Sequence, residues 1–226
     1  MGNFGVVIAA AGQGKRMGAA DKKQFIELDG KPVLYHTVHL FTRIPEVKEI
    51  VVVTNADDIP RTQALLPDFP GIRVVAGGAE RQHSVYLGLQ ALNLAEYALI
   101  HDAARPFATI DMIRRVMEKT VEMGAAIPAV PVKDTIKMVD EKRDVIQTPS
   151  RQSLWAVQTP QAFRLFDILE AHRKAEEKEF LGTDDAMLME WLGYRVSVVE
   201  GEYTNIKLTT PEDLRLAETI IEKRRR

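Results

Sequence analysis

The sequence contains no cysteine among its 226 residues. Disulfides, thiol nucleophiles, iron–sulfur clusters and Cys-ligated zinc sites are therefore excluded. An excess of charge of either sign is also missing, because 30 Lys and Arg stand against 32 Asp and Glu, for a formal net charge of −2. A balance so close to zero argues against bulk nucleic-acid binding and leaves only a local basic patch as a site for polyanions.

Long apolar runs are absent as well. No run approaches the roughly 18 residues that a membrane span requires. The N-terminus has no basic region ahead of its short apolar stretch, and Val6 stands where a myristoylation motif beginning at Gly2 needs Ser or Thr. We therefore expect a cytoplasmic protein that has neither a membrane nor a nucleic acid as partner.

The composition that remains is typical of a globular protein, with 46% hydrophobic and 27% charged residues. The length is about one and a half times that of a typical domain, which is enough for a large core. We expect a single domain over residues 1–226, including an arm at about residues 133–152.

Short β-branched segments alternate with longer segments of helical period, and this alternation predicts an α/β fold with a mostly parallel sheet covered on both faces. The predicted strands are Val6–Ala10, Ile50–Thr54, Ile72–Val75, Ala98–His101, Ala125–Val130 and Arg195–Val199. The predicted helices are Val33–Phe41, Asp58–Leu66, Arg81–Leu92, Ile110–Met123, Phe163–Lys178, Asp184–Trp191 and one that begins at Pro211.

The segment Lys133–Arg151 interrupts this alternation. A charged turn at Asp140–Asp144 is flanked by two short β-like runs, Thr135–Val139 and Val145–Thr148, which predict a hairpin. Because an isolated hairpin is marginally stable in water, we expect it to pack against something else, and a second subunit is the favoured candidate. An ordinary surface hairpin is the alternative.

A Gly-rich loop follows the first predicted strand. Residues 9–18 are mostly small and include Gly12 and Gly14, so backbone N–H groups could approach an anion closely. Four cations occur within nine positions of the loop: Lys15, Arg16, Lys22 and Lys23. This pattern predicts a site for a polyphosphate, and a purely structural turn is the alternative.

Two common phosphate-binding motifs do not fit this loop. A Walker motif needs Ser or Thr after its Gly-Lys, but Arg16 follows Lys15. The dinucleotide fingerprint needs a small residue where Met17 stands, because Gly18 comes one place too late.

Motifs along almost the whole chain resemble those of the 2-C-methyl-D-erythritol 4-phosphate cytidylyltransferases, a family of polyol-phosphate cytidylyltransferases in non-mevalonate isoprenoid synthesis. In chain order the motifs are Ala10-Ala11-Gly12-x-Gly14-x-Arg16-Met17, Lys23-Gln24, Gly77-Gly78-x-Glu80-Arg81-x-x-Ser84-Val85, His101-Asp102-Ala103-Ala104-Arg105-Pro106, Pro131-Val132-Lys133-Asp134-Thr135, Leu154-Trp155-x-x-Gln158-Thr159-Pro160-Gln161, Thr183-Asp184 and Asn205-Ile206-Lys207.

The resemblance implies an activity and an architecture. Members of the family transfer the cytidylyl group of CTP to the phosphate of methylerythritol phosphate and release pyrophosphate, with a divalent metal that is usually Mg²⁺. Their fold is Rossmann-like, with three α/β/α layers and a protruding hairpin arm that builds a homodimer. We therefore expect one nucleotidyltransferase domain whose dimer forms through the arm.

The resemblance also implies the site residues. Those expected to bind the nucleotide are Ala10, Ala11, Gly12, Gly14, Arg16, Lys23, Gly78, Ser84, Asp102 and Ala103. Those expected to bind the polyol phosphate are Asp102, Arg105, Arg151, Thr159, Thr183 and Lys207. The catalytic set is Arg16, Lys23, Arg151 and Lys207, with Asp102 as the candidate metal ligand and Arg151 acting within its own chain or across the dimer.

The chemistry of the reaction agrees with this set. A phosphomonoester has a second pKa of about 6, so the attacking phosphate is already anionic and needs no general base. The obstacle is repulsion between the attacking anion and the triphosphate, which positioned cations overcome.

Three other functions are alternatives to cytidylyl transfer to methylerythritol phosphate. A ribitol-phosphate cytidylyltransferase generally has Ala-Gly-Gly in its loop and Asp-Ser-Val-Arg-Pro in its middle motif, whereas this chain has Ala10-Ala11-Gly12 and Asp102-Ala103-Ala104-Arg105-Pro106. A nicotinamide-dependent Rossmann enzyme is disfavoured by the misplaced third glycine. A non-catalytic nucleotide-binding regulator stays open, although the chain matches both substrate and nucleotide motifs.

Overall fold

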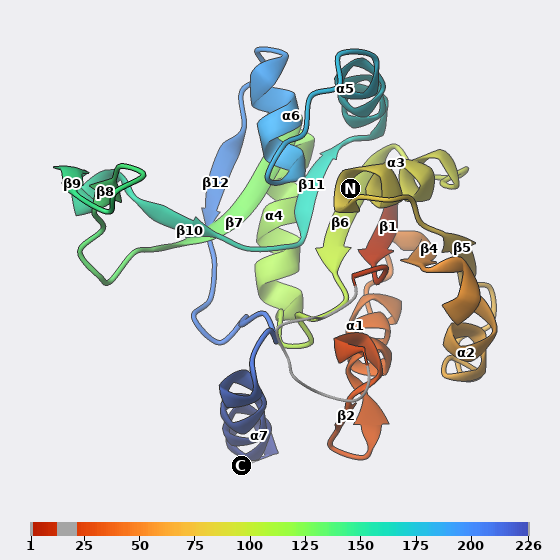
Figure 1. Cartoon of the computed structure of the whole chain (residues 1–226). Coiled ribbons are helices and arrows are strands. Elements are labelled where there is room, and N and C mark those ends of the chain that lie inside the picture. Colours follow the sequence, from red (N-terminus) through yellow and green to blue (C-terminus); the bar gives the residue numbers. More distant parts are fainter. Residues whose placement is uncertain (1, 13–21, 226) are drawn as a thin grey trace.

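The computed structural model describes residues 2–12 and 22–225, which form a central sheet with helices on both faces (Figure 1). The strands of this sheet are β1 (Phe4–Ala9), β4 (Val47–Thr54), β5 (Arg73–Ala76), β6 (Tyr97–Asp102), β7 (Ala125–Pro131), β10 (Trp155–Val157), β11 (Gln161–Arg164) and β12 (Ser197–Glu200). The α-helices are α1 (Val33–Thr42), α2 (Ile59–Ala64), α3 (Arg81–Gln90), α4 (Ile110–Met123), α5 (Leu165–Glu177), α6 (Asp185–Trp191) and α7 (Pro211–Arg225).

The strand order is β10-β7-β11-β6-β1-β4-β5, and β12, the eighth strand of this sheet, also pairs with β7. β1 lies parallel to both β4 and β6, β4 lies parallel to β5, and β12 lies parallel to β7. The pairs that β10 and β11 make with β7 and β6 are antiparallel. The predicted α/β fold with a mostly parallel sheet is therefore confirmed.

Two details of the prediction are wrong at β10 and β11. The sequence pattern puts Phe163 at the start of a helix, but Phe163 lies in β11 and α5 begins at Leu165. No strand was expected at Trp155–Val157, which forms β10. Phe163 is fully buried in the same core as Ile168 of α5, so its apolar character suits either element, and pairing with β6 and β7 decides the conformation.

The alternation of side chains along β1 divides the core into two layers. Phe4, Val6 and Ile8 face α1 and α4, whereas Val7 faces α3 and its neighbours α5 and α6. Both faces of the sheet are therefore covered, as expected for a strand with apolar residues at successive positions.

Helix α3 lies very close to the sheet, and Gly88 makes this possible. A Cβ atom at Gly88 would stand 2.5 Å from Cγ1 of Val7 and 2.7 Å from Cγ2 of Val53. The close packing fixes α3 against β1 and β4, and so fixes the residues of its first turn at the carboxyl edge of the sheet.

The helix starts follow the capping signals of the sequence. Asp184 caps α6 by accepting a hydrogen bond from the backbone N–H of Met187. At the start of α7, Thr210 and Asp213 cap each other's backbone N–H groups. Helix α7 packs on a small satellite core that includes Phe107 and Leu208.

The predicted hairpin is present and projects away from the sheet (Figure 1). It consists of β8 (Met138–Val139) and β9 (Val145–Gln147), which pair antiparallel, and it ends near the short helix η4 (Arg151–Ser153). Two other short strands, β2 (Glu27–Leu28) and β3 (Lys31–Pro32), pair beside α1, and further short helices occur at η2 (Lys23–Phe25) and η3 (Ala56–Asp58). Among the described residues, no helix has the length and apolar character needed to cross a membrane.

Candidate active site

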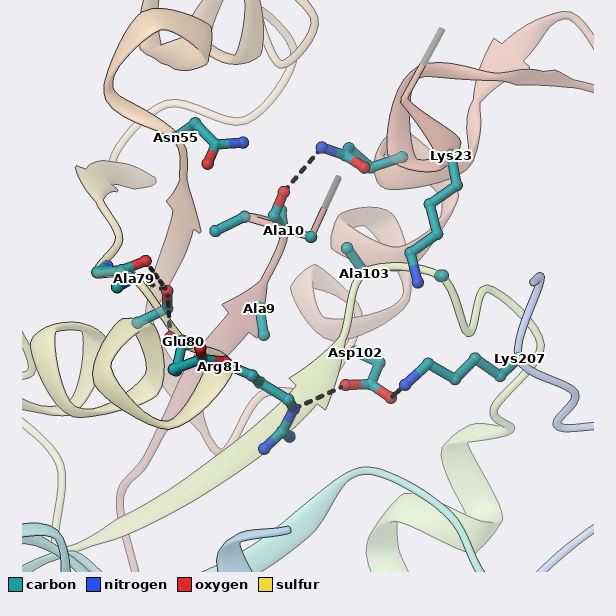
Figure 2. A pocket seen from close by; sticks show the side chains of 16 residues that line it. Ala9, Ala10, Lys23, Asn55, Ala79, Glu80, Arg81, Asp102, Ala103 and Lys207 are labelled. Atoms are coloured by element: carbon teal, nitrogen blue, oxygen red, sulfur yellow. Dashed lines mark hydrogen bonds and ion pairs between the residues drawn. The ribbon is translucent and has the colours of Figure 1, made fainter. Parts of the chain in front are cut away.

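A cavity of about 460 Å³ opens where β1, β4, β5 and β6 end. Parallel strands place their carboxyl ends at one edge of a sheet, which is where open α/β sheets bind ligands. Figure 2 shows the side chains that line it. The lining residues are Ala9, Ala10, Ala11, Gly12, Lys23, Gln24, Asn55, Gly78, Ala79, Glu80, Arg81, Ser84, Asp102, Ala103, Ala104 and Lys207.

Most of the site residues expected from the sequence meet in this cavity. Those that line it are Ala10, Ala11, Gly12, Lys23, Gly78, Ser84, Asp102, Ala103 and Lys207. They come from segments about 200 residues apart in the chain, which the order of the strands brings to a single edge.

Asp102 is the electrostatic centre of the cavity. Its Oδ2 lies 2.7 Å from Nζ of Lys207, and its Oδ1 accepts a 3.3 Å hydrogen bond from Nε of Arg81 (Figure 2). Nε of Arg105 stands 3.7 Å from Oδ2. Burial alone would raise the pKa of the Asp102 carboxyl, but Arg81, Lys207 and Arg105 hold this pKa well below its usual range. Asp102 is therefore ionised, and it holds the charged groups of Arg81 and Lys207 at the cavity wall.

Arg81 is a site residue that the sequence analysis missed. It is the first residue of α3, and its NH1 group donates a 2.8 Å hydrogen bond to the buried carboxylate of Asp185. Burial would lower the pKa of the Arg81 guanidinium, yet Asp185 and Asp102 together raise it. The signal was available, because Arg81 stands inside the Gly77–Val85 motif and immediately before the helix that follows a strand end.

A side-chain hydrogen bond joins the end of β1 to η2. Gln24 donates a 2.8 Å hydrogen bond from Nε2 to the carbonyl oxygen of Ala10, the residue that follows β1. η2 in turn places Lys23 on the cavity wall (Figure 2). Across the cavity, the backbone N–H of Gly78 donates a 3.1 Å hydrogen bond to Oγ of Ser84. Lys23 and Lys207 thus lie on one side of the cavity, and Arg81 reaches Asp102 from the opposite side (Figure 2).

Comparison with known proteins agrees with this geometry. A sequence model of the family described as 2-C-methyl-D-erythritol 4-phosphate cytidylyltransferase (IspD) matches residues 4–223. The chain belongs to this family. It is therefore a nucleotidyltransferase, as its motifs predicted.

Individual relatives are similar over almost their full length. The cytidylyltransferase of Halalkalibacterium halodurans is 53% identical over 227 residues, which cover 99% of each chain. That of Bacillus velezensis is 54% identical over 220 residues, which cover 96% of this chain and 94% of the relative.

Solved structures agree in the fold. The 4-diphosphocytidyl-2C-methyl-D-erythritol synthase of Anaerococcus prevotii is similar with a TM-score of 0.88 and 36% identity, over 98% of this chain and 96% of that one. The cytidylyltransferase of Thermus thermophilus is similar with a TM-score of 0.81 and 35% identity, over 97% and 99% of the two chains.

Some residues expected at the site of this cytidylyltransferase lie elsewhere. Arg151 is exposed in η4 and donates a 2.9 Å hydrogen bond from NH1 to the carbonyl oxygen of Lys133, at the base of the arm. Thr183 is exposed just before α6, and its hydroxyl contacts Sδ of Met187. Neither residue lines the cavity of its own chain.

Two others lie behind the cavity wall. Thr159 is buried and accepts a hydrogen bond at Oγ1 from the backbone N–H of Asp102. Arg105 donates a 2.8 Å hydrogen bond from NH1 to the carbonyl oxygen of Asn205. Gly14 and Arg16, also predicted for the nucleotide, lie outside the described residues.

The sequence reasoning also missed Gln24 and Asn55. Asn55 follows the end of β4 and donates a hydrogen bond from Nδ2 to Asp58, which also pairs with Lys22. A search of strand ends for polar side chains would have found Asn55, because β4 ends one residue earlier, at Thr54. Gln24 stands next to Lys23 in the quoted motif, and only the structure shows that it donates to the carbonyl oxygen of Ala10.

The donor set limits how a metal could bind. Within residues 2–12 and 22–225, no three His, Asp or Glu side chains come together as a protein-built metal centre would require. Asp102 and Glu80 are the carboxylates on the cavity wall. This arrangement fits an ion such as Mg²⁺, which commonly keeps its waters and takes one or two carboxylates together with substrate phosphates.

Proposed function

We propose that this enzyme joins the cytidylyl group of CTP to the phosphate of 2-C-methyl-D-erythritol 4-phosphate and releases pyrophosphate. A phosphate oxygen of the polyol forms a bond to the α-phosphorus of CTP while the bond from that phosphorus to the bridging oxygen of the β-phosphate breaks. Because the nucleophile is already an anion, no proton has to be removed from it. The single observation that carries this proposal is the convergence of Lys23, Lys207 and Arg81 on one cavity, around ionised Asp102.

The nucleotide is placed along the small-residue wall of the cavity. Ala10, Ala11 and Gly12 follow β1, and Gly78 and Ser84 stand across from them. Side chains this small leave room for a base and a ribose close to the backbone. The triphosphate then runs toward Lys23, with Arg16 of the same loop completing the positive charge, as the family motif implies.

The polyol phosphate is placed on the side of Lys207. The Lys207 ammonium is held 2.7 Å from Asp102, so its position is fixed before a substrate arrives. Preorganised cations of this kind stabilise charge that develops in the transition state without having to reorganise during the reaction. Mg²⁺, held mainly by the phosphates of CTP and by Asp102, would supply further charge neutralisation.

We further propose a homodimer built through the arm, with Arg151 acting at the site of the partner subunit. The arm exposes Met138, Val139, Val145 and Ile146, each at least half exposed, on a hairpin that buries little within its own chain. Burying such side chains in a second copy would stabilise the hairpin. We treat residues 1–226 as one catalytic domain and place the reaction in the cytoplasm.

The test is pyrophosphate release with CTP and either methylerythritol phosphate or ribitol 5-phosphate as acceptor. We expect release with the first acceptor and at least about tenfold less with the second, since each 1.4 kcal/mol of lost acceptor binding costs a factor of ten. UTP in place of CTP is the control for the base. Faster release with ribitol 5-phosphate would show that the proposed acceptor is wrong. Absence of release with either acceptor would contradict the proposed reaction.

A further inference from the structure

A closed ring of four hydrogen bonds lies beneath Asp102. His101 Nδ1 is 3.0 Å from Oγ1 of Thr159, and His101 Nε2 is 3.0 Å from the carbonyl oxygen of Arg105. Arg105 donates from NH1 to the carbonyl oxygen of Asn205 at 2.8 Å. Asn205 closes the ring by donating from Nδ2 to the carbonyl oxygen of Thr159 at 3.0 Å.

The protonation of His101 follows from these partners. The carbonyl oxygen of Arg105 can only accept, so Nε2 of His101 must carry its hydrogen. His101 is fully buried, and its two ring partners are a carbonyl oxygen and a hydroxyl, neither of which could balance a positive charge, so the ring is neutral and Nδ1 is a bare acceptor. The imidazole is therefore the Nε2–H tautomer, with its orientation fixed at both nitrogens.

This tautomer determines the direction of the Thr159 hydroxyl. Because Nδ1 of His101 can only accept, the hydrogen of Thr159 Oγ1 points toward it. The oxygen then accepts from the backbone N–H of Asp102, 3.1 Å away. The hydroxyl hydrogen is thus used inside the protein, and Thr159 has no second hydrogen to donate to a substrate phosphate.

The ring joins the two segments that form the central ion pair. His101 precedes Asp102 in the chain, and Asn205 stands two residues before Lys207. The carboxylate and the ammonium of this pair are 2.7 Å apart at the cavity wall. Arg105 is a member of the ring and also lies beside the ion pair, because its Nε stands 3.7 Å from Oδ2 of Asp102. Every link of the ring is buried or partly buried, which strengthens each hydrogen bond and makes a missing partner costly.

We propose that His101, as the Nε2–H tautomer, is a positioning residue that sets the direction of this ring and so holds Asp102 and Lys207 in place for the acceptor phosphate. Thr159 acts through His101 and through the backbone of Asp102, and not by donating to the substrate. The link to the acceptor phosphate rests on the proposed function, whereas the tautomer and the ring do not.

Thr159→Val and Thr159→Ser form a matched pair of variants, because valine keeps the shape without the hydroxyl and serine keeps the hydroxyl. Residues that orient the ligands of a metal site are commonly worth about 10–100-fold in affinity or activity, and we take this range for a residue that orients Asp102. We expect Thr159→Val to lose that much in kcat/KM for methylerythritol phosphate and to change KM for CTP less than about threefold, while Thr159→Ser stays within about threefold of wild type. Equal losses in the serine and valine variants would overturn the role of the hydroxyl.

The double variant separates action through His101 from direct contact with substrate. His101→Phe keeps the aromatic packing against Phe41, whose ring centroid lies 5.0 Å from that of His101, and removes both hydrogen bonds. If Thr159 acts through His101, adding Thr159→Val to His101→Phe costs little more than His101→Phe alone. Additive losses would show that Thr159 contacts the substrate independently, and would overturn the proposal.

A measurement without substrate keeps the proposal distinct from the proposed function. The ¹⁵N chemical shifts of the His101 ring in the wild-type protein report the tautomer directly, and we expect hydrogen on Nε2 and none on Nδ1. The Nδ1 shift should move in Thr159→Val and stay in Thr159→Ser. Hydrogen on Nδ1 would overturn the inference even in an enzyme that makes pyrophosphate from CTP and methylerythritol phosphate. Correct shifts in an enzyme without that activity would instead refute the proposed function.

Discussion

The cavity around Asp102 and the hairpin arm differ in how far one chain completes them. In the cavity, Asp102 has cationic partners at 2.7 Å and 3.3 Å, and hydrogen bonds continue into the interior behind it. In the arm, Val145 and Ile146 are 60% and 65% exposed. In the first region the carboxylate of Asp102 finds its cationic partners within one chain, whereas the second leaves apolar surface that a second chain could cover.

Because of this difference, we expect substitutions in the two regions to have different effects. Substitutions in the cavity should alter turnover while leaving the assembly intact, because the affected partners belong to the same chain. Substitutions in the arm should alter the assembly first and turnover only through Arg151, at the base of the arm. The predictions below test this separation, in order of decreasing effect.

The largest effect is expected at the nucleotide end of the cavity. Lys23→Met should lower turnover by about 10³-fold or more, as positioned cations do in related phosphoryl transfers, and Arg16→Met should do the same. Steady-state kinetics measure the loss, and circular dichroism checks the fold. Lys22→Met is the matched control, because Lys22 pairs with Asp58 and does not line the cavity. Near-wild-type turnover in Lys23→Met would contradict the proposal that Lys23 stabilises the transition state.

A smaller effect is expected at the acceptor end. Lys207→Ala removes the ammonium beside Asp102 and should lower kcat/KM for methylerythritol phosphate by about 10²-fold, close to the loss of one positioned charge in other sites. The affinity for CTP, measured by calorimetry, should change much less. Lys119→Ala, an exposed helix lysine paired with Glu122, is the control for loss of a lysine. A defect confined to CTP binding would contradict the assignment of Lys207 to the acceptor.

The arm should determine the oligomeric state. Ile146→Asp places a carboxylate in the exposed apolar surface of the hairpin, and we expect monomers by light scattering with an unchanged circular dichroism spectrum. Turnover should fall as well, because Arg151 would then lack a partner site. Lys142→Glu, at the charged turn, is the matched control and should leave the mass unchanged. A dimer that persists in Ile146→Asp would show that the interface lies elsewhere.

The smallest effect is a dependence of stability on pH. The pKa of His101 is about 4 in the folded chain and 6.5 when unperturbed, so the unfolded chain binds a proton more readily. The stability contributed by neutral His101 is therefore present above pH 6.5 and is lost as the pH falls toward 4. Linkage gives a loss of about 2 kcal/mol in the free energy of unfolding between pH 7 and pH 5.

Urea unfolding at several pH values measures this loss. His101→Gln cannot take up the proton, so its free energy of unfolding should fall by less over the same interval, whatever its stability at pH 7. The other histidines are present in both proteins and serve as the internal control. An identical slope in the variant and the wild type would show that His101 does not carry the dependence.

Local sequence signals were sufficient to predict much of the secondary structure of this protein. Strands such as Ile50–Thr54 and helices such as Ile110–Met123 were predicted from β-branched runs and helical periodicity, and the hairpin was predicted from its charged turn. The conformation around Phe163 was not predicted correctly. A buried apolar residue just before a helix has the same sequence pattern whether it lies in a strand or begins the helix.

The sequence by itself determined the order of the motifs, the small residues after the first strand and the absence of any thiol, because these depend on residue type and spacing. Only the tertiary structure decided that Arg81 bridges Asp102 and Asp185, and that Thr159 faces His101. These contacts join residues 21, 104 and 58 positions apart, and the sheet topology, not local pattern, brings them within hydrogen-bond distance. The small net charge of −2 thus concealed a set of cations that only the folded sheet assembles around one carboxylate.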